Sequence, residues 1–354
     1  MPRLAFDGGS AHLIACLFRL TVTAGLCQEW KKGGAVLLLA WGLLSSFGCG
    51  LVSREVKVPQ LVAPLSTATL DELLARLNDF QRVRTLSARV ALQFQTEAPE
   101  SGLGRRYRTA DGRLILARPA SVRLLIQAPL VKTTIAELAS DGHRFQLLVY
   151  PEDHRLFVEG SNDRDYTERE EALERNPQWR EVGSLRRVRP QHITEALLWE
   201  PVDEADANRL TTLEEFRQIE EERVPGQKPR MVIRSYYIIS LLEPAGPHRA
   251  RILRKFWFDR TRGLLLVRQQ VFGEAGEIRS EIRYEEFATA PNSSSLIPVE
   301  IRIARPYDRY SVRLGLDRTS LVVNGEVSEA LFRLEKPAEW GDAVRVINLD
   351  RKGN

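Results

Sequence analysis

Apolar and polar residues alternate along most of the chain between positions 86 and 317. Leu86, Ala88, Val90, Leu92 and Phe94 mark the first such run, with polar or small residues between them. Alternation with a period of two predicts a strand with one buried face and one face in water. Equivalent runs predict further strands at about 106–117, 121–128, 131–140, 143–150, 154–160, 230–243, 250–259, 264–273, 277–288, 297–305 and 309–317.

The predicted strands follow one another without interleaved helices, which favours an antiparallel sheet over a parallel α/β fold. Asp111-Gly112 and Asp141-Gly142 are hairpin-turn signals between or within these runs. About eleven or twelve strands exceed what an open, twisted sheet usually tolerates, so the sheet is expected to bend. The sequence therefore predicts a mainly β fold with helices (α+β), in which a curled antiparallel sheet forms an incomplete barrel with its apolar face inside.

A helix is predicted just before the first strand. Thr69 and Glu72 have the spacing of a capping box, and leucines recur every three or four positions from there to Phe80. This spacing places the leucines on one helix face. We expect an amphipathic helix that packs on the sheet.

Residues 161–229 break the alternation and are predicted to form a charged helical insertion, with short helices at about 167–175 and 191–199. Between Glu195 and Glu222, ten acidic residues stand against two arginines. Such a block of like charge usually serves solubility, so the insertion is interpreted as a solvated excursion. The alternative is that its second helix is a lid over a cavity, formed by Ile193, Leu197, Leu198 and Trp199.

The N-terminal residues have the pattern of a secretion signal. Lys31 and Lys32 precede an apolar run at 33–48, which ends at Cys49. A basic pair, an apolar core that is short for a membrane span and small residues before a cysteine indicate a bacterial lipoprotein signal, with Cys49 lipidated. A cleaved or uncleaved signal without lipid is the alternative.

These segments set the predicted boundaries. Residues 1–29 are interpreted as a start site assigned too early, 30–49 as the signal segment and 50–67 as a tether; 68–340 are one domain that contains the insertion, and 341–354 a C-terminal tail. All three cysteines lie within the first 49 residues. The predicted domain therefore contains neither a disulfide nor a cysteine-ligated metal.

Charge and chemistry narrow the function classes. The 51 Lys and Arg residues nearly balance the 47 Asp and Glu residues and are dispersed, so nucleic-acid binding is not predicted. The sequence has no G-x-S-x-G, H-E-x-x-H or Walker A motif. His143 and His154 lie in neighbouring predicted strands, but a clear third metal ligand is lacking. Neither an enzyme, nor a metal site, nor any other cofactor is predicted.

Short motifs along about residues 70–335 resemble the LolA and LolB lipoprotein-localization factors and their relatives. The motifs are Gly112-Arg113-Leu114-Ile115-Leu116, Arg118-Pro119, Val122-Arg123-Leu124, Pro129, Asp141-Gly142, Val149-Tyr150-Pro151, Trp257-Phe258-Asp259, Gly263-Leu264, Tyr284 and Ile297-Pro298. The resemblance implies an incomplete antiparallel barrel closed by helices over a hydrophobic cavity that holds acyl chains. LolA is a soluble periplasmic carrier and LolB an outer-membrane-anchored acceptor, so a lipidated Cys49 would make this chain more similar to LolB.

The candidate lining of such a cavity is the set of aliphatic and aromatic residues on the predicted inward face. They are Leu92, Phe94, Leu114, Leu116, Leu124, Ile126, Phe145, Ile233, Tyr237, Phe256, Phe258, Ile282, Tyr284, Ile301, Ile303, Val312 and Leu314. Each acyl CH₂ transferred from water into an apolar cavity contributes about 0.8 kcal/mol, so a hollow core of this composition binds lipid without any catalytic group. The alternative for each residue is that it belongs to a solid core.

Two functions follow as alternatives. The first is a carrier or acceptor of lipids or lipoproteins, lipid-anchored to the outer membrane and facing the periplasm, with a soluble periplasmic or inner-membrane-anchored location as alternatives. The second is a structural envelope lipoprotein with a solid core, which docks an envelope protein partner through its acidic insertion. A hollow core favours the first function.

Overall fold

The structure of the chain, a computed structural model, describes residues 59–96, 108–164, 166, 169, 173, 175, 188–203, 205–224, 226–341 and 344–351. The chain divides into a unit of Met1–Lys57 and a unit of Val58–Asn354, and every described residue lies in the second. The predicted signal segment and Cys49 lie outside the described residues. None of the helices among the described residues combines the length and apolarity needed to cross a bilayer.

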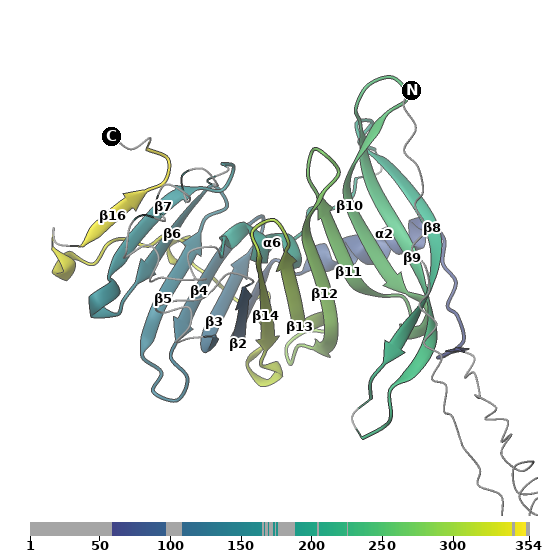
Figure 1. Cartoon of the computed structure of the whole chain (residues 1–354), viewed down its shortest axis with the longest axis horizontal. Helices are drawn as coiled ribbons and strands as arrows, with labels where there is room; N and C mark the ends of the chain where they lie inside the picture. The colour runs from purple at the N-terminus through teal and green to yellow at the C-terminus, as the bar shows by residue number, and fades with distance from the viewer. Residues whose placement is uncertain are drawn as a thin grey trace, which may run out of the picture. The chain divides into compact units, whose positions relative to one another are not determined.

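One sheet of sixteen strands organises the described residues (Figure 1). The strands are β1 (Gln60–Leu61), β2 (Thr85–Thr96), β3 (Thr109–Ala117), β4 (Ser121–Gln127), β5 (Thr134–Ser140), β6 (Arg144–Val149), β7 (Leu156–Ser161), β8 (Leu210–Glu222), β9 (Arg230–Pro244), β10 (Ala250–Asp259), β11 (Leu265–Phe272), β12 (Ile278–Thr289), β13 (Leu296–Arg305), β14 (Tyr310–Leu316), β15 (Val322–Val323) and β16 (Arg345–Asn348). They lie in the order β1-β9-β10-β11-β12-β13-β14-β2-β3-β4-β5-β6-β7-β16, with β8 paired to β9 and β15 to β2.

The sheet is mixed, which corrects the prediction of a purely antiparallel one. Every predicted strand run contains a strand, and the neighbours joined by hairpins pair antiparallel. β1 pairs with β9 in parallel, and β16 pairs with β7 in parallel. Both are short strands near the chain ends and are joined to their partners by long connections, which do not impose the antiparallel direction that a tight hairpin does.

The sheet is curled and does not close. Among the described strands, β8 pairs only with β9, and β16 only with β7. With sixteen strands and few helices, the described part of the chain is mainly β.

Two α-helices among the described residues lie against the sheet (Figure 1). α2 (Leu70–Asp79) begins at the predicted capping box, in which the Thr69 amide donates to the Glu72 carboxylate over 2.8 Å, and Leu73, Leu74 and Leu77 are buried. α6 (Pro190–Leu197) is the predicted helix at 191–199 and packs against β4, β5 and β13. The predicted helix at 167–175 falls mostly outside the described residues.

The domain extends beyond its predicted boundaries. The last thirteen residues of the acidic stretch, which we predicted to be solvated, form the strand β8, which pairs with β9 along its whole length. The predicted C-terminal tail contributes β16, and Ile347 and Leu349 are buried in the main core. In β8 only every second residue faces apolar neighbours, and many of its other residues are glutamates. The sequence pattern therefore did not identify it as a strand.

The two Asp-Gly signals have different outcomes. Asp141-Gly142 lies in the turn between β5 and β6, where Gly142 has a φ of 96°. Asp111-Gly112 lies inside β3, so a turn there is wrong. A Cβ on Gly112 would stand 2.2 Å from the Leu125 carbonyl oxygen, and the glycine is needed for this close approach of two strands.

Apolar side chains from one face of the sheet, from α2 and from α6 form one continuous core cluster. We call the sheet face that carries this cluster the inner face. On the outer face, Leu334 and Trp340 from the C-terminal segment cover Ala139, Leu148 and Phe157 of β5, β6 and β7. This cover explains why those strands are buried on both faces rather than alternating.

Candidate functional site

The predicted cavity-lining residues lie on the inner face. All of them except Ile233 and Tyr237 are buried members of the main core cluster, and Tyr237 packs against its edge. Register explains why they meet: Ile282, Ile303, Val312 and Phe94 are successive partners across β12, β13, β14 and β2. The structure thus gathers the residues into one apolar surface, which α2 and α6 cover.

The predicted lid residues lie over this surface. Ile193, Leu197, Leu198 and Trp199 are buried in the main cluster. The Trp199 ring stacks on Phe80, which follows α2, with ring centroids 4.6 Å apart. Trp199 therefore joins the end of α6 to the end of α2.

The C-terminal end of α6 is fastened by side chains from the sheet. Gln269 donates from Nε2 to the Glu195 carbonyl oxygen over 3.0 Å, and the Tyr284 hydroxyl donates to the Ala196 carbonyl oxygen over 2.6 Å. The last carbonyls of a helix have no partner within the helix, so a buried helix end needs such donors. Burial raises the pKa of Tyr284, which keeps its hydroxyl proton available for this bond.

Arg118 is the centre of these contacts. Its guanidinium donates to the carbonyl oxygens of Val83 (3.0 Å), Leu198 (3.3 Å) and Trp199 (3.0 Å), and to that of Phe80 over 3.4 Å. Burial lowers the pKa of Arg118 from its very high ordinary value. One cation therefore ties the end of α6, the segment after α2 and the β3–β4 turn together.

A buried histidine lies in the first turn of α6. Nδ1 of His192 makes a short hydrogen bond with the Tyr310 hydroxyl of β14. Burial, and then the positive charges of Arg305 and Arg189, lower the pKa of His192 well below its usual range. His192 is therefore neutral at neutral pH, and α6 has polar attachments at both ends.

Sequence reasoning missed Arg118, Gln269 and His192. Arg118 was visible only as part of an Arg-Pro turn motif, and Gln269 is the middle one of three polar residues, Arg268, Gln269 and Gln270, between apolar ones. These residues bind carbonyl oxygens, or in one case a tyrosine, that are distant in the sequence. No local sequence pattern therefore marks them. The signal that was present is a polar residue at a position that the strand period assigns to the inner face.

Two clefts lie away from the inner face, at the β6–β7–β16 end of the sheet, with volumes of about 220 and 330 Å³. Of the predicted lining residues, Phe145 borders the first, and arginines and other polar residues form most of both walls. In the described part of the chain, no group of three or more His, Cys, Asp or Glu residues is placed to hold a metal ion.

No protein-family profile and no curated protein matches the chain. Solved structures similar to it include a DUF1329 family protein from Desulfovibrio piger, at 12% identity over 74% of this chain and 95% of that one, with a TM-score of 0.43. A LolA superfamily protein from Nitrosomonas europaea matches at 9% identity, 76% and 99% coverage and a TM-score of 0.38. A domain assigned to an outer membrane lipoprotein-sorting protein from Vibrio parahaemolyticus matches at 9%, 73% and 94%, with a TM-score of 0.36.

Proposed function

We propose that this protein is a non-catalytic carrier or acceptor in the bacterial cell envelope, which holds acyl chains of lipids or lipoproteins against the inner face of its sheet. The single observation that carries the proposal is a broad apolar surface that one short helix, α6, covers together with α2. α6 has eight residues, and side chains from the sheet bind its last carbonyls.

Such a helix suits a lid because its attachments are local and exchangeable. Gln269 and Tyr284 each donate one hydrogen bond to a backbone oxygen of α6, and Arg118 donates one each to the Leu198 and Trp199 oxygens. Each bond has a net contribution of about 1 kcal/mol, or somewhat more for the charged donor. When α6 moves outward, an acyl chain can replace the apolar side chains of Ile193 and Leu197. Each buried CH₂ then offsets the lost packing by about 0.8 kcal/mol.

Attachment to the membrane is proposed through Cys49. A lipid on this residue would retain the folded unit at the envelope, facing the periplasm. Cys49→Ser is expected to shift the protein from the membrane fraction to the soluble periplasmic fraction, and labelling with a palmitate analogue should mark the wild type alone. An unlabelled wild type would contradict the anchor but not acyl-chain binding.

Acyl-chain binding is tested on the full chain, purified from cells with minimal detergent. Native mass spectrometry should detect a co-purified lipid, and a fluorescent fatty acid should bind and be displaced by unlabelled lipid. Gln269→Leu removes a donor to α6 and should speed release of the fluorescent fatty acid several-fold. Gln270→Leu is the matched control, because Gln270 is the next residue of β11 and accepts from Trp257 Nε1 on the outer face.

The structural-lipoprotein alternative is favoured by one observation. The predicted lining residues pack against one another and against α2 and α6 in one cluster. A solid core predicts no co-purified lipid, no fatty-acid binding by the wild type, and equal behaviour of the Gln269 and Gln270 variants. That result would leave docking of an envelope partner as the function.

A further inference from the structure

The β8–β9 hairpin carries exposed apolar residues beside the strand through which the chain enters the sheet. Ile219, Ile233 and Leu61 lie in one register row across β8, β9 and β1. Met231 lies two residues before Ile233 and therefore on the same face. The exposed fractions are 50% for Leu61, 58% for Ile219 and 50% for Met231. We call these four residues the hairpin patch.

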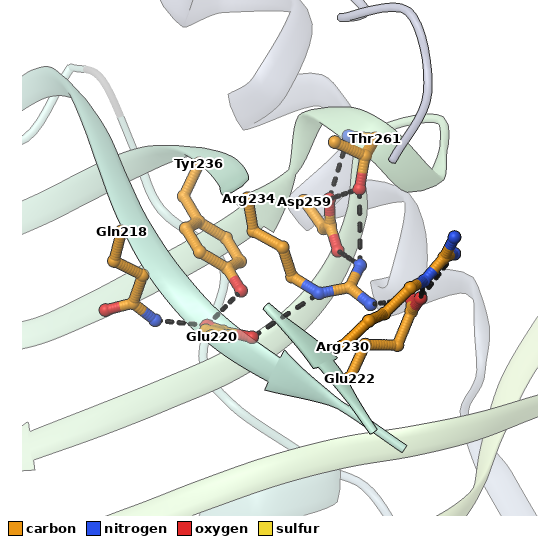
Figure 2. A network of polar contacts seen from close by, with 8 residues as sticks. All are labelled: Gln218, Glu220, Glu222, Arg230, Arg234, Tyr236, Asp259 and Thr261. Atoms are coloured by element: carbon orange, nitrogen blue, oxygen red, sulfur yellow. Dashed lines mark hydrogen bonds and ion pairs between the residues drawn. The ribbon is translucent and has the colours of Figure 1, made fainter. Parts of the chain in front are cut away.

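The acidic residues on the opposite face of the same hairpin are neutralised by arginines (Figure 2). Glu222 contacts Arg230 at 2.6 Å and Arg234 at 2.8 Å, and Arg234 also lies 3.4 Å from Glu220. The Tyr236 hydroxyl donates to the Glu220 carboxylate over 2.7 Å. Glu220 and Glu222 alternate with the patch residues along the strands, so they lie on the face opposite the patch and are paired there.

The remaining charges of the hairpin end are balanced in the same way. Glu221 pairs with Arg223 at 2.9 Å. Between positions 219 and 234 the chain has four basic residues and three acidic ones. A slightly positive, locally paired surface can approach an anionic lipid headgroup layer without the repulsion that the acidic run alone would cause.

The hairpin patch and the chain entry are held in one rigid arrangement. Arg234 reaches Asp259 at 3.4 Å, and Asp259 accepts from the Thr261 amide over 2.8 Å. Arg260 donates from Nε to the Ser66 carbonyl oxygen over 2.9 Å, and the Ser66 amide donates to the Arg260 carbonyl oxygen over 2.9 Å. The segment after β1 is thereby fastened to the same end of the sheet.

We propose that the hairpin patch docks on the surface of a phospholipid bilayer. The short length of chain between Cys49 and β1 supports this docking. Cys49 and Gln60 are eleven residues apart, which spans about 40 Å when fully extended, and Gln60 begins β1, which contains part of the patch. The inference rests on the proposed anchor at Cys49, because that anchor would bring this end of the sheet to the bilayer.

Exposed aliphatic side chains at that position would be stabilised by leaving water for the boundary between the lipid headgroups and the acyl chains. The docked hairpin would fix how the folded unit faces the membrane. Leu130, in the turn after β4, is a competing apolar tip with an exposed fraction of 94%, but the tether does not enter the sheet beside β4.

The test uses the full chain with Cys16 and Cys27 replaced by Ser, because the described residues contain no cysteine and the label then attaches at the introduced position. Ile219→Cys and Met231→Cys carry an environment-sensitive fluorophore on protein reconstituted into phosphatidylethanolamine–phosphatidylglycerol vesicles. We expect blue-shifted emission and quenching by lipids that carry a shallow quencher. Val346→Cys in β16, with an exposed fraction of 48%, is the matched control and should report water.

A second experiment tests docking of the hairpin patch independently of the lipid anchor at Cys49. Cys49→Ser protein with an N-terminal hexahistidine is held on nickel-chelating lipid in the same vesicles, so the tether does not depend on lipidation. Ile219→Glu with Met231→Glu should abolish the shift of a label at Leu61→Cys. A label at Leu130→Cys that enters the bilayer while the hairpin labels stay in water would overturn the proposal. A shift that needs no vesicles and rises with protein concentration would do the same, because it would indicate a second copy of the chain.

Discussion

The Arg118 guanidinium donates to the Trp199 carbonyl oxygen over 3.0 Å. It thereby links the turn before β4 to the buried residues that follow α6. The two residues are 81 positions apart in the sequence. The same cation also binds the carbonyls of Val83 and Leu198. A side chain that serves several backbone oxygens at once cannot be replaced by any single apolar residue.

Replacing this cation should therefore destabilise the domain. Arg118→Met leaves partly buried carbonyl oxygens without a donor, and we expect a loss of about 2 kcal/mol in the free energy of unfolding. Trp199 fluorescence should report the loosened end of α6, and denaturant unfolding measures the cost. Arg84→Met is the control, because the Arg84 side chain is exposed although its carbonyl oxygen accepts from the Arg118 amide over 2.8 Å, and it should change stability by about 0.5 kcal/mol or less.

The strand register makes a sharp contrast between neighbours in β12. Ile282 is buried opposite Ile303, whereas Arg283 is exposed and pairs with Glu281 at 2.8 Å. Ile282→Asp should cost about 3 kcal/mol or more, because it buries a carboxyl without a partner. Arg283→Asp should cost about 1 kcal/mol or less, since exposed ion pairs contribute little. Equal melting temperatures for the two variants would show that the register is wrong.

A methyl group should be tolerated at one strand glycine and not at another. Gly112→Ala places a Cβ 2.2 Å from the Leu125 carbonyl oxygen, whereas the nearest atom to a Cβ on Gly315 is a Glu300 carboxylate oxygen at 3.4 Å. We expect a loss of about 2–3 kcal/mol for Gly112→Ala, because two strands must separate. Gly315→Ala should lie within about 0.5 kcal/mol of the wild type, and thermal melting compares them.

The buried histidine predicts a pH dependence of stability. Because burial lowers the pKa of His192 in the folded state, below about pH 6.5 the unfolded chain binds a proton that the folded chain does not. Stability should therefore fall as pH drops through that value, with a contribution of at most about 1.4 kcal/mol per pH unit. His192→Gln should flatten this part of the profile between about pH 7 and pH 5.

The sequence by itself determined twelve of the sixteen strands, the first helix and the residues of the apolar face. Period-two alternation places Ile282 and Ile303 on one side of their strands whatever the neighbours are, because successive side chains of a strand point to opposite faces. The capping box at Thr69 is equally local, since its donor and acceptor are three residues apart.

Only the tertiary structure decided what covers that face and how the cover is held. β8 is a strand although five of its thirteen residues are glutamates, because β9 offers it a full ladder of backbone partners. The assembly of Arg118, Gln269 and Tyr284 around the end of α6 also depends on tertiary structure, because it joins a turn and two strands to a helix far away in the chain. A hydrogen bond to a backbone carbonyl requires only that the donor be nearby in space, and it leaves no pattern in the sequence of either partner.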